Sequence, residues 1–129
     1  VNFFYKDRGS ETGSLDQKIM TDSVAAGGKD YLVITSLSVR QTFAGMQLCG
    51  TTEKPYLFLK EISSNGNCQT VDVIFPAIPI FLYLNPELVK LLLEPLYENQ
   101  EAGKYPNTYA MHDLGANYPQ HIGHPKGDD

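Results

Sequence analysis

The chain has 129 residues, of which 42% are hydrophobic and 19% are charged, a composition typical of one globular domain. Its net charge of −5 and its ten scattered basic residues exclude a nucleic-acid-binding protein, because phosphate contacts need clustered lysine and arginine. The longest apolar run, residues 73–84, is interrupted by Pro76 and Pro79 and is shorter than the roughly 20 residues that cross a bilayer. The sequence therefore predicts no contact with nucleic acid and no membrane helix.

The first part of the chain predicts two helices separated by glycine. Residues 14–26 carry apolar side chains near helical spacing, and Gly27 and Gly28 then end the helix. A second helix is predicted at about 30–48, before Gly50. Its apolar residues lie on more than one face, which indicates a helix buried on two sides.

The middle of the chain predicts a β-hairpin at about 55–75. Two runs with the composition of strands flank Asn65-Gly66, and this dipeptide is the strongest short signal for a hairpin turn. Side chains alternate along a strand, so Leu57 and Leu59 are expected to share one face.

A third helix is predicted at about 86–102. Asn85 and Pro86 have the chemistry of a helix start, and Pro95 is expected to kink or divide the helix. Residues 104–129 are rich in Gly, Pro, His and Asn and predict a loop region. The predicted fold class is mainly α with one β-hairpin.

Two groups of residues could carry chemistry. In the hairpin, cross-strand pairing would bring Lys60 and Glu61 close to Asp72, and two carboxylates beside an ammonium can perform general acid–base catalysis. The alternative is an ordinary charged hairpin face with a cross-strand ion pair. In the loop, the adjacent His112 and Asp113 could polarise a water or an amide, or they could be a surface histidine and a capping aspartate.

The loop region also contains donors that a metal could use. They are His112, His121, His124, Asp113, Asp128 and Asp129. Catalytic zinc usually takes two ligands from one rigid element, whereas these residues lie in a Gly- and Pro-rich loop, so we expect no metal and no other cofactor.

Three longer phrases resemble the secreted fungal glutaminase A family. They are KEISSNGNCQTVDVIFP from Lys60, NPELVKLLLEPLYENQEAG from Asn85 and YPNTYAMHDLGANYPQ from Tyr105, with further matches at residues 22–32 and 37–51. The resemblance implies part of an (α/α)6 toroid, a secreted protein, and hydrolysis of L-glutamine to L-glutamate and ammonia. Such a toroid needs more helices than 129 residues can hold, so we expect a fragment whose partner is the remainder of the parent chain or a second copy.

The leading hypothesis is thus a glutaminase with Asp72, Glu61 and Asp113 as acid–base candidates and Lys60 and His112 as substrate-binding groups. One alternative is a non-catalytic fragment that acts as a binding module and dimerises to cover its apolar helix faces. Another is a toroid enzyme resembling glycoside hydrolases, which also use paired carboxylates, although the chain has no Trp to bind sugar.

Cys49 and Cys68 could form one disulfide or remain two free thiols. The secreted nature of the family that the chain resembles slightly favours the disulfide.

Overall fold

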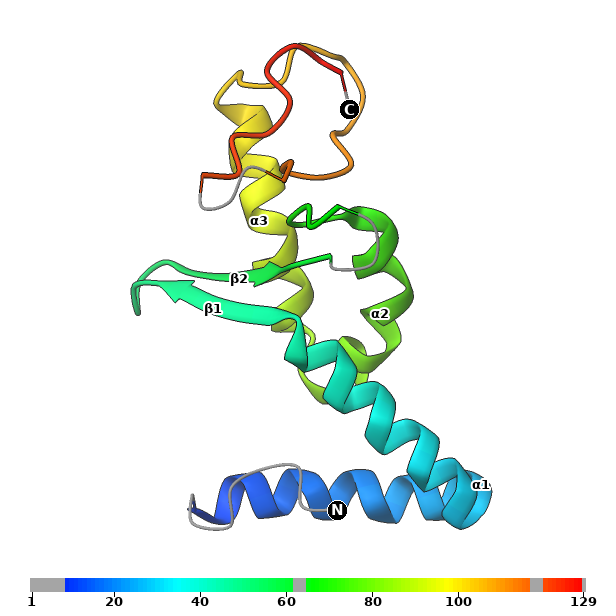
Figure 1. The fold of residues 1–129 in the computed structure, drawn as a ribbon. Coiled ribbons are helices and arrows are strands. Elements are labelled where there is room, and N and C mark those ends of the chain that lie inside the picture. The colour runs from blue at the N-terminus through cyan, green and yellow to red at the C-terminus, as the bar shows by residue number, and fades with distance from the viewer. Residues whose placement is uncertain (1–8, 62–64, 117–119, 129) are drawn as a thin grey trace. The chain divides into compact units, whose positions relative to one another are not determined.

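The computed structural model describes residues 9–61, 65–116 and 120–128, with side chains from residue 13. The elements are α1 (Gly9–Ala44), β1 (Met46–Gly50), β2 (Pro55–Leu59), α2 (Val71–Leu84) and α3 (Glu87–Glu101) (Figure 1). The chain is mainly helical with one two-stranded antiparallel hairpin, as the sequence predicted. It divides into two compact units, Val1–Ala44 and Gly45–Asp129.

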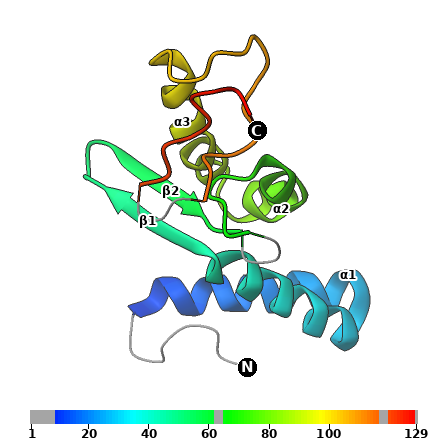
Figure 2. The same ribbon diagram turned by 45° about the horizontal axis from the view of Figure 1, so that its top comes forward.

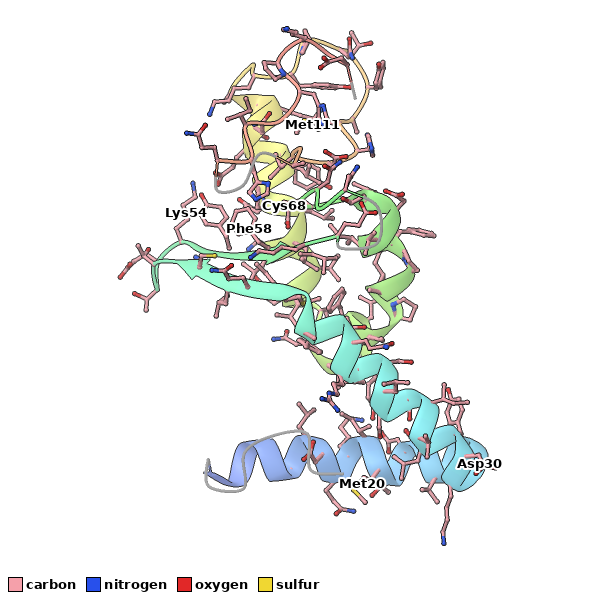
Figure 3. All side chains as sticks on the ribbon, viewed as in Figure 1. Met20, Asp30, Lys54, Phe58, Cys68 and Met111 are labelled. Carbon is pink, nitrogen blue, oxygen red and sulfur yellow. The ribbon has the colours of Figure 1, made fainter. Side chains whose placement is uncertain are left out.

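The first unit consists of α1, which contains a break at Gly28. Gly28 has φ 76° and ψ −166°, a conformation that glycine adopts without steric penalty. Across the break, the hydroxyl oxygens of Ser23 and Thr35 lie 2.8 Å apart and share a hydrogen bond. The break falls where the sequence predicted a helix end, and the labelled Met20 and Asp30 of Figure 3 lie on either side of it.

Two expectations for α1 were wrong. The helical segment before the break begins at Gly9 rather than at about residue 14, and the segment after it ends at Ala44 rather than at about residue 48. In the described structure Val33 and Ile34 of the second segment are exposed, as expected for such a helix when the chain is a fragment on its own.

The hairpin pairs β1 with β2, from Met46 opposite Leu59 to Gly50 opposite Pro55. The prediction of a hairpin at 55–75 was therefore correct for its first strand, β2, but wrong about the partner, which is β1 and not the run after Asn65-Gly66. Gly50 has φ 90°, and a side chain there would collide with the Lys54 carbonyl oxygen, so the turn requires glycine. Leu57 and Leu59 are both buried on one face of β2, as alternation predicted.

The chain does turn at Asn65-Gly66, but among the described residues on its two sides there is one bridge, between Lys60 and Cys68. The segment after this turn pairs with the C-terminal loop instead. Leu114 N–H donates to Cys68 O at 2.9 Å, and Val71 N–H donates to His112 O at 2.8 Å. The run predicted as the second strand is helix α2, which includes Pro76 and Pro79.

The core of the second unit lies where α2 and β2 pack against α3 (Figure 1). Phe81 of α2 and Leu92 of α3 are fully buried. Gln69 is also fully buried, and its side-chain amide accepts from Leu59 N–H at 2.6 Å and donates to the carbonyl oxygens of Leu57 and Leu92. This one side chain thus ties β2 to α3.

A second apolar cluster lies between the hairpin, the end of α3 and the loop that follows. Its buried members are Cys68, Leu96, Tyr105, Met111 and Leu114, and Phe58 and Leu93 pack against them (Figure 3). The hairpin is also tied to α3 through Glu98, which lies 2.6 Å from the Lys54 ammonium and accepts from the Tyr56 hydroxyl at 2.8 Å.

Helix α3 begins as the sequence predicted, because the Asn85 side-chain oxygen accepts from Glu87 N–H at 3.1 Å. Of the two effects expected of Pro95, a kink or a division, the division does not occur, since α3 continues through it and Pro95 is buried. After Gly103, the loop folds back over the C-terminal end of α3 (Figures 1 and 2), where Met111 N–H donates to the Gln100 side chain. None of the helices that the structure describes is long and apolar enough to span a bilayer.

Two phenylalanines of α2 give a matched test of this packing. Phe81→Ala should lower the free energy of unfolding by about 3–5 kcal/mol, because Phe81 is 0% exposed and truncation leaves a cavity. Phe75→Ala should change it by no more than about 0.5 kcal/mol, because Phe75 is 69% exposed. Urea unfolding followed by circular dichroism measures both, and equal losses would contradict the assignment of the core.

Candidate functional site

Three segments of the second unit meet to form one polar site. Residues 67–70 are hydrogen-bonded to residues 112–115, where Cys68 N–H donates to Gly115 O at 3.2 Å. Residues 121–124 join them, because Gly123 N–H donates to Leu114 O at 2.9 Å. This arrangement gathers six polar side chains, which we call the polar cluster. They are Asn67, Cys68, His112, Asp113, His121 and His124.

Asp113 lies at the centre of the polar cluster and is 0% exposed. Its Oδ1 accepts from His124 Nε2 at 2.7 Å and from Gly115 N–H at 2.6 Å. Its Oδ2 accepts from Asn67 Nδ2 at 2.7 Å, and His112 Nε2 lies 2.9 Å from the same oxygen. A buried charge is tolerated when it is paired and hydrogen-bonded, and here three hydrogen bonds and the nearby His112 ring surround the carboxylate.

These contacts decide the charge of Asp113. Burial alone would raise its pKa, but hydrogen bonds from His124, Gly115 N–H and Asn67, with the charge of His112, outweigh burial and lower the pKa below 3.8. Asp113 is therefore ionised at neutral pH and acts only as an acceptor. It follows that the Nε2 atoms of His112 and His124 that face it carry hydrogens.

The two histidines differ in their access to solvent. The side chain of His112 is 52% exposed, whereas that of His124 is 17% exposed. Their rings stack with centroids 6.1 Å apart and an angle of 18° between planes. With Nε2 of His112 facing the Asp113 carboxylate, Nδ1 is the ring nitrogen left for a substrate or a water, so His112 has the chemistry of a general base.

Cys68 and His121 form a second pair in the polar cluster. Cys68 Sγ lies 2.9 Å from His121 Nε2, and His121 Nδ1 lies 2.8 Å from Gly115 O. Since a carbonyl only accepts, Nδ1 donates and Nε2 is left to accept from the thiol. Burial raises the pKa of the Cys68 thiol, and the positive charge of Lys60 lowers it by less, so Cys68 is a neutral buried thiol. Cys49 and Cys68 are both free thiols, and the disulfide that the sequence left open is not formed.

The backbone in and next to the polar cluster is strained at two positions. Within the described ranges, the non-glycine residues with positive φ are Gln69, at 57°, and His121, at 42°. Such conformations cost about 1–3 kcal/mol each, and they are concentrated at functional sites. At Gln69, the three hydrogen bonds of the buried side chain to backbone groups hold the strained conformation.

The structure brings together only some of the residues that the sequence nominated. His112 and Asp113 lie in the polar cluster. Lys60 and Glu61 lie on the segment that leads to it, where Glu61 accepts a long hydrogen bond from Thr70 at 3.4 Å. Asp72 is exposed in the first turn of α2. The expected pairing of Asp72 with Lys60 and Glu61 across a hairpin was wrong, because residue 72 is helical.

Sequence reasoning missed the role of Asn67 and considered His121 and His124 only as metal ligands. No sequence signal marks Asn67 as a partner of Asp113, since the contact joins residues 46 positions apart. No group of three or more His, Cys, Asp or Glu side chains in the described part of the chain is arranged to hold a metal ion. Asp129, one of the donors considered, lies outside the described residues.

Comparison with known proteins identifies the class. Residues 28–129 match the family model of the glutaminase A six helical-hairpin domain, so the chain belongs to this family. It is 64% identical to glutaminase A of Aspergillus oryzae (strain ATCC 42149 / RIB 40) over 132 aligned residues, which cover 100% of this chain and 19% of that protein. It is 52% identical to a protein named "Probable glutaminase" of Arthroderma benhamiae (strain ATCC MYA-4681 / CBS 112371), with 87% of this chain and 13% of that protein aligned. No solved structure matched the chain significantly.

The buried carboxylate predicts how stability depends on pH. Because the pKa of Asp113 is lower in the folded state than its ordinary value of 3.8, the group stabilises the fold above that value, and this contribution is lost as pH falls below it. Asp113→Asn should cost on the order of 3 kcal/mol at pH 7 and should flatten the loss of stability in acid. Thermal unfolding from pH 3 to pH 7 measures this.

Asp72→Asn is the matched control, because Asp72 is exposed at the start of α2 and its loss should cost less than about 1 kcal/mol. The charge assigned to Asp113 would be contradicted if Asp113→Asn were as stable as Asp72→Asn and still lost stability at low pH as the unaltered protein does.

The two thiols should differ in reactivity. In native conditions Cys68 should react with a disulfide-exchange reagent at least about tenfold more slowly than Cys49, because Cys68 is buried and its thiol is neutral. The rates can be assigned with Cys49→Ser and Cys68→Ser. If Cys68 in the native protein reacts as fast as Cys49, its thiol is not covered by His121 and the residues next to it, and the prediction is wrong.

Proposed function

We propose that the chain takes part in hydrolysis of the side-chain amide of L-glutamine to L-glutamate and ammonia, and that the polar cluster supplies the general base. The observation that carries the proposal is the contact between the half-exposed His112 and the buried, ionised Asp113, 2.9 Å apart, in a chain of the glutaminase A six helical-hairpin family. Both named relatives are called glutaminases, and this chain spans only 19% of the first of them.

In the proposed reaction, the exposed His112 ring removes a proton from a water molecule through Nδ1. The water attacks the amide carbon of glutamine and forms a tetrahedral oxyanion. The proton on His112 then passes to the departing amine, which leaves as ammonia, while the carbon–oxygen bond is retained in glutamate. Asp113 fixes the ring orientation and stabilises the imidazolium that forms in the first step.

The remaining sequence candidates fit supporting roles. Lys60 and Glu61 lie next to the polar cluster in the fold, so binding of the glutamine carboxylate and ammonium groups is the role proposed for them. Asp72 is the weakest candidate, because its carboxylate is exposed on α2. Secretion, expected from the family resemblance, is part of this proposal.

The test replaces the matching segment of the Aspergillus glutaminase A with this chain. At 64% identity, the inserted segment is expected to preserve the packing around it. His112→Gln should lower kcat for ammonia release about 10²–10⁴-fold, because a glutamine amide can still donate to Asp113 but cannot take a proton. The control is Lys90→Gln, at an exposed position of α3, which should leave kcat unchanged.

Two results would reject the proposal. One is an active chimera in which His112→Gln turns over glutamine at the unaltered rate, and the other is hydrolysis of glycosides in place of glutamine. The isolated chain should be assayed in parallel with light scattering. A dimer without turnover would favour the alternative of a non-catalytic module that covers exposed apolar residues such as Val33, Phe75 and Leu82.

A further inference from the structure

We propose that Asn65 is a site of spontaneous deamidation, and that the isoaspartate formed there disrupts the polar cluster by moving Asn67. Asparagine is a chemically labile residue, and a following glycine makes it more so, because glycine has no side chain to shield its backbone nitrogen. Asn-Gly occurs once in the sequence, at residues 65–66. The proposal is independent of the proposed function, because its primary readouts are mass and stability.

The reaction needs only the chain itself and water. The backbone nitrogen of Gly66 attacks Cγ of Asn65, so that an N–Cγ bond forms and the bond from Cγ to Nδ2 breaks. Ammonia leaves with the proton from the Gly66 nitrogen, and a succinimide ring remains. Water then opens the ring. Cleavage between N and Cγ gives aspartate, whereas cleavage between N and the backbone carbonyl carbon gives isoaspartate, in which the main chain runs through Cγ.

The structure exposes Asn65 and holds its side chain in a turn. Because Asn65 is an exposed residue, water can reach the ring. Its Oδ1 accepts from Asn67 N–H at 3.0 Å, which folds the side chain back over the Gly66 peptide and polarises the carbonyl that is attacked. A Cβ placed on Gly66 would have the Glu61 carbonyl oxygen as its nearest described neighbour, at 3.8 Å, an ordinary van der Waals distance. The described atoms therefore leave room for the ring.

The two sides of this turn are bonded to each other. Lys60 and Cys68 form a bridge across it, and Glu61 N–H donates to Asn67 O at 2.9 Å. Isoaspartate inserts Cβ into the main chain between these contacts, and it converts the side-chain acceptor of Asn67 N–H into a main-chain carbonyl with a different geometry. The longer main chain must therefore displace Asn67 or break the contacts across the turn.

Asn67 connects the turn to the polar cluster. Its Nδ2 donates to Asp113 Oδ2 at 2.7 Å, and Cys68, the next residue, donates its N–H to Gly115 O. Movement of Asn67 removes one hydrogen bond from the buried carboxylate, while Gly115 and His124 continue to donate to Oδ1. We therefore expect isoaspartate to make the second unit less stable without unfolding it.

The first test follows the mass of the folded protein during incubation near pH 8. Deamidation replaces an amide with an acid, and peptide mapping with an isoaspartate-specific methyltransferase locates the product. The reference is the same chain unfolded in guanidinium chloride, where no structure restrains the turn. Asn65 in the folded protein should react within about tenfold of the unfolded rate, because the turn already brings the side chain and the Gly66 peptide together. A lower rate would mean that the fold protects Asn65 and would overturn the proposal.

Asn65→Ser is the matched control for the site. A serine hydroxyl can accept from Asn67 N–H in the same kind of turn, but it has no carbonyl carbon for Gly66 to attack. In this variant the deamidated peptide should disappear, and the thermal midpoint should not fall during incubation. An undiminished gain of acid in Asn65→Ser would assign the reaction to another asparagine and reject the site.

Asn65→Asp separates the new charge from the altered main chain, because it carries a carboxylate on the ordinary chain path. Freshly prepared Asn65→Asp should unfold within about 1 °C of the unaltered protein, whereas the purified isoaspartate form should unfold roughly 3–8 °C lower. In an Asn67→Ala background, where the contact with Asp113 is already absent, isoaspartate should lower the midpoint by less than about half as much. Equal losses in the two backgrounds would show that Asn67 does not carry the effect to the polar cluster.

Only the catalytic consequence rests on the proposed function. In the chimera described above, kcat should fall in step with the isoaspartate content, and Asn65→Ser should keep its initial kcat. A kcat that stays constant while isoaspartate accumulates would refute the disruption and leave the proposed reaction supported. A chimera that never turns over glutamine would reject the proposed reaction, and the mass and stability measurements would still decide the fate of Asn65.

Discussion

The loop segments of the second unit depend on one buried charge. Asp113 is ionised and fully buried, and two of its donors, Asn67 and His124, come from other segments, 46 and 11 residues away in the sequence. Leaving such a charge without one of its donors would cost several kcal/mol, so the carboxylate holds the segments around residues 67, 113 and 124 in one arrangement. The loop after Gly103, which has no helix or strand in its described part, thereby acquires a specific structure. Polar contacts, rather than regular secondary structure, specify the site.

The sequence predicted well those features that local chemistry determines. The start of α3 follows from Asn85 and Pro86, and the break in α1 follows from glycine at position 28. The predicted hairpin was wrong for a tertiary reason. Asn65-Gly66 does form a turn, but the residues after it pair with residues 112–115 and do not form the expected second strand. The run after Thr70 is apolar enough for a strand or a helix, and packing on α3 selects the helix.

For the site, adjacency in sequence was the only usable signal. His112 and Asp113 are neighbours and could be paired from the sequence alone. Asn67 and His124 reach Asp113 only through the fold, so no spacing pattern could nominate them as its partners. The strain at Gln69 was equally hidden, because glutamine is not a residue that prefers positive φ. Its conformation is imposed by β2 and α3, whose backbone groups its side chain bonds.

The division between a polar cluster and an apolar core bears on how the second unit comes apart. The contacts of Phe81 and Leu92 between α2 and α3 do not depend on the ionisation of any side chain, whereas those around Asp113 do. Protonation of Asp113 would therefore release residues 112–115 and 121–124 while the pair of helices remains packed. Such a state is a partial unfolding unit in which the helical scaffold survives and the proposed reaction centre is lost. In acid, loss of the polar cluster would thus precede loss of helical structure.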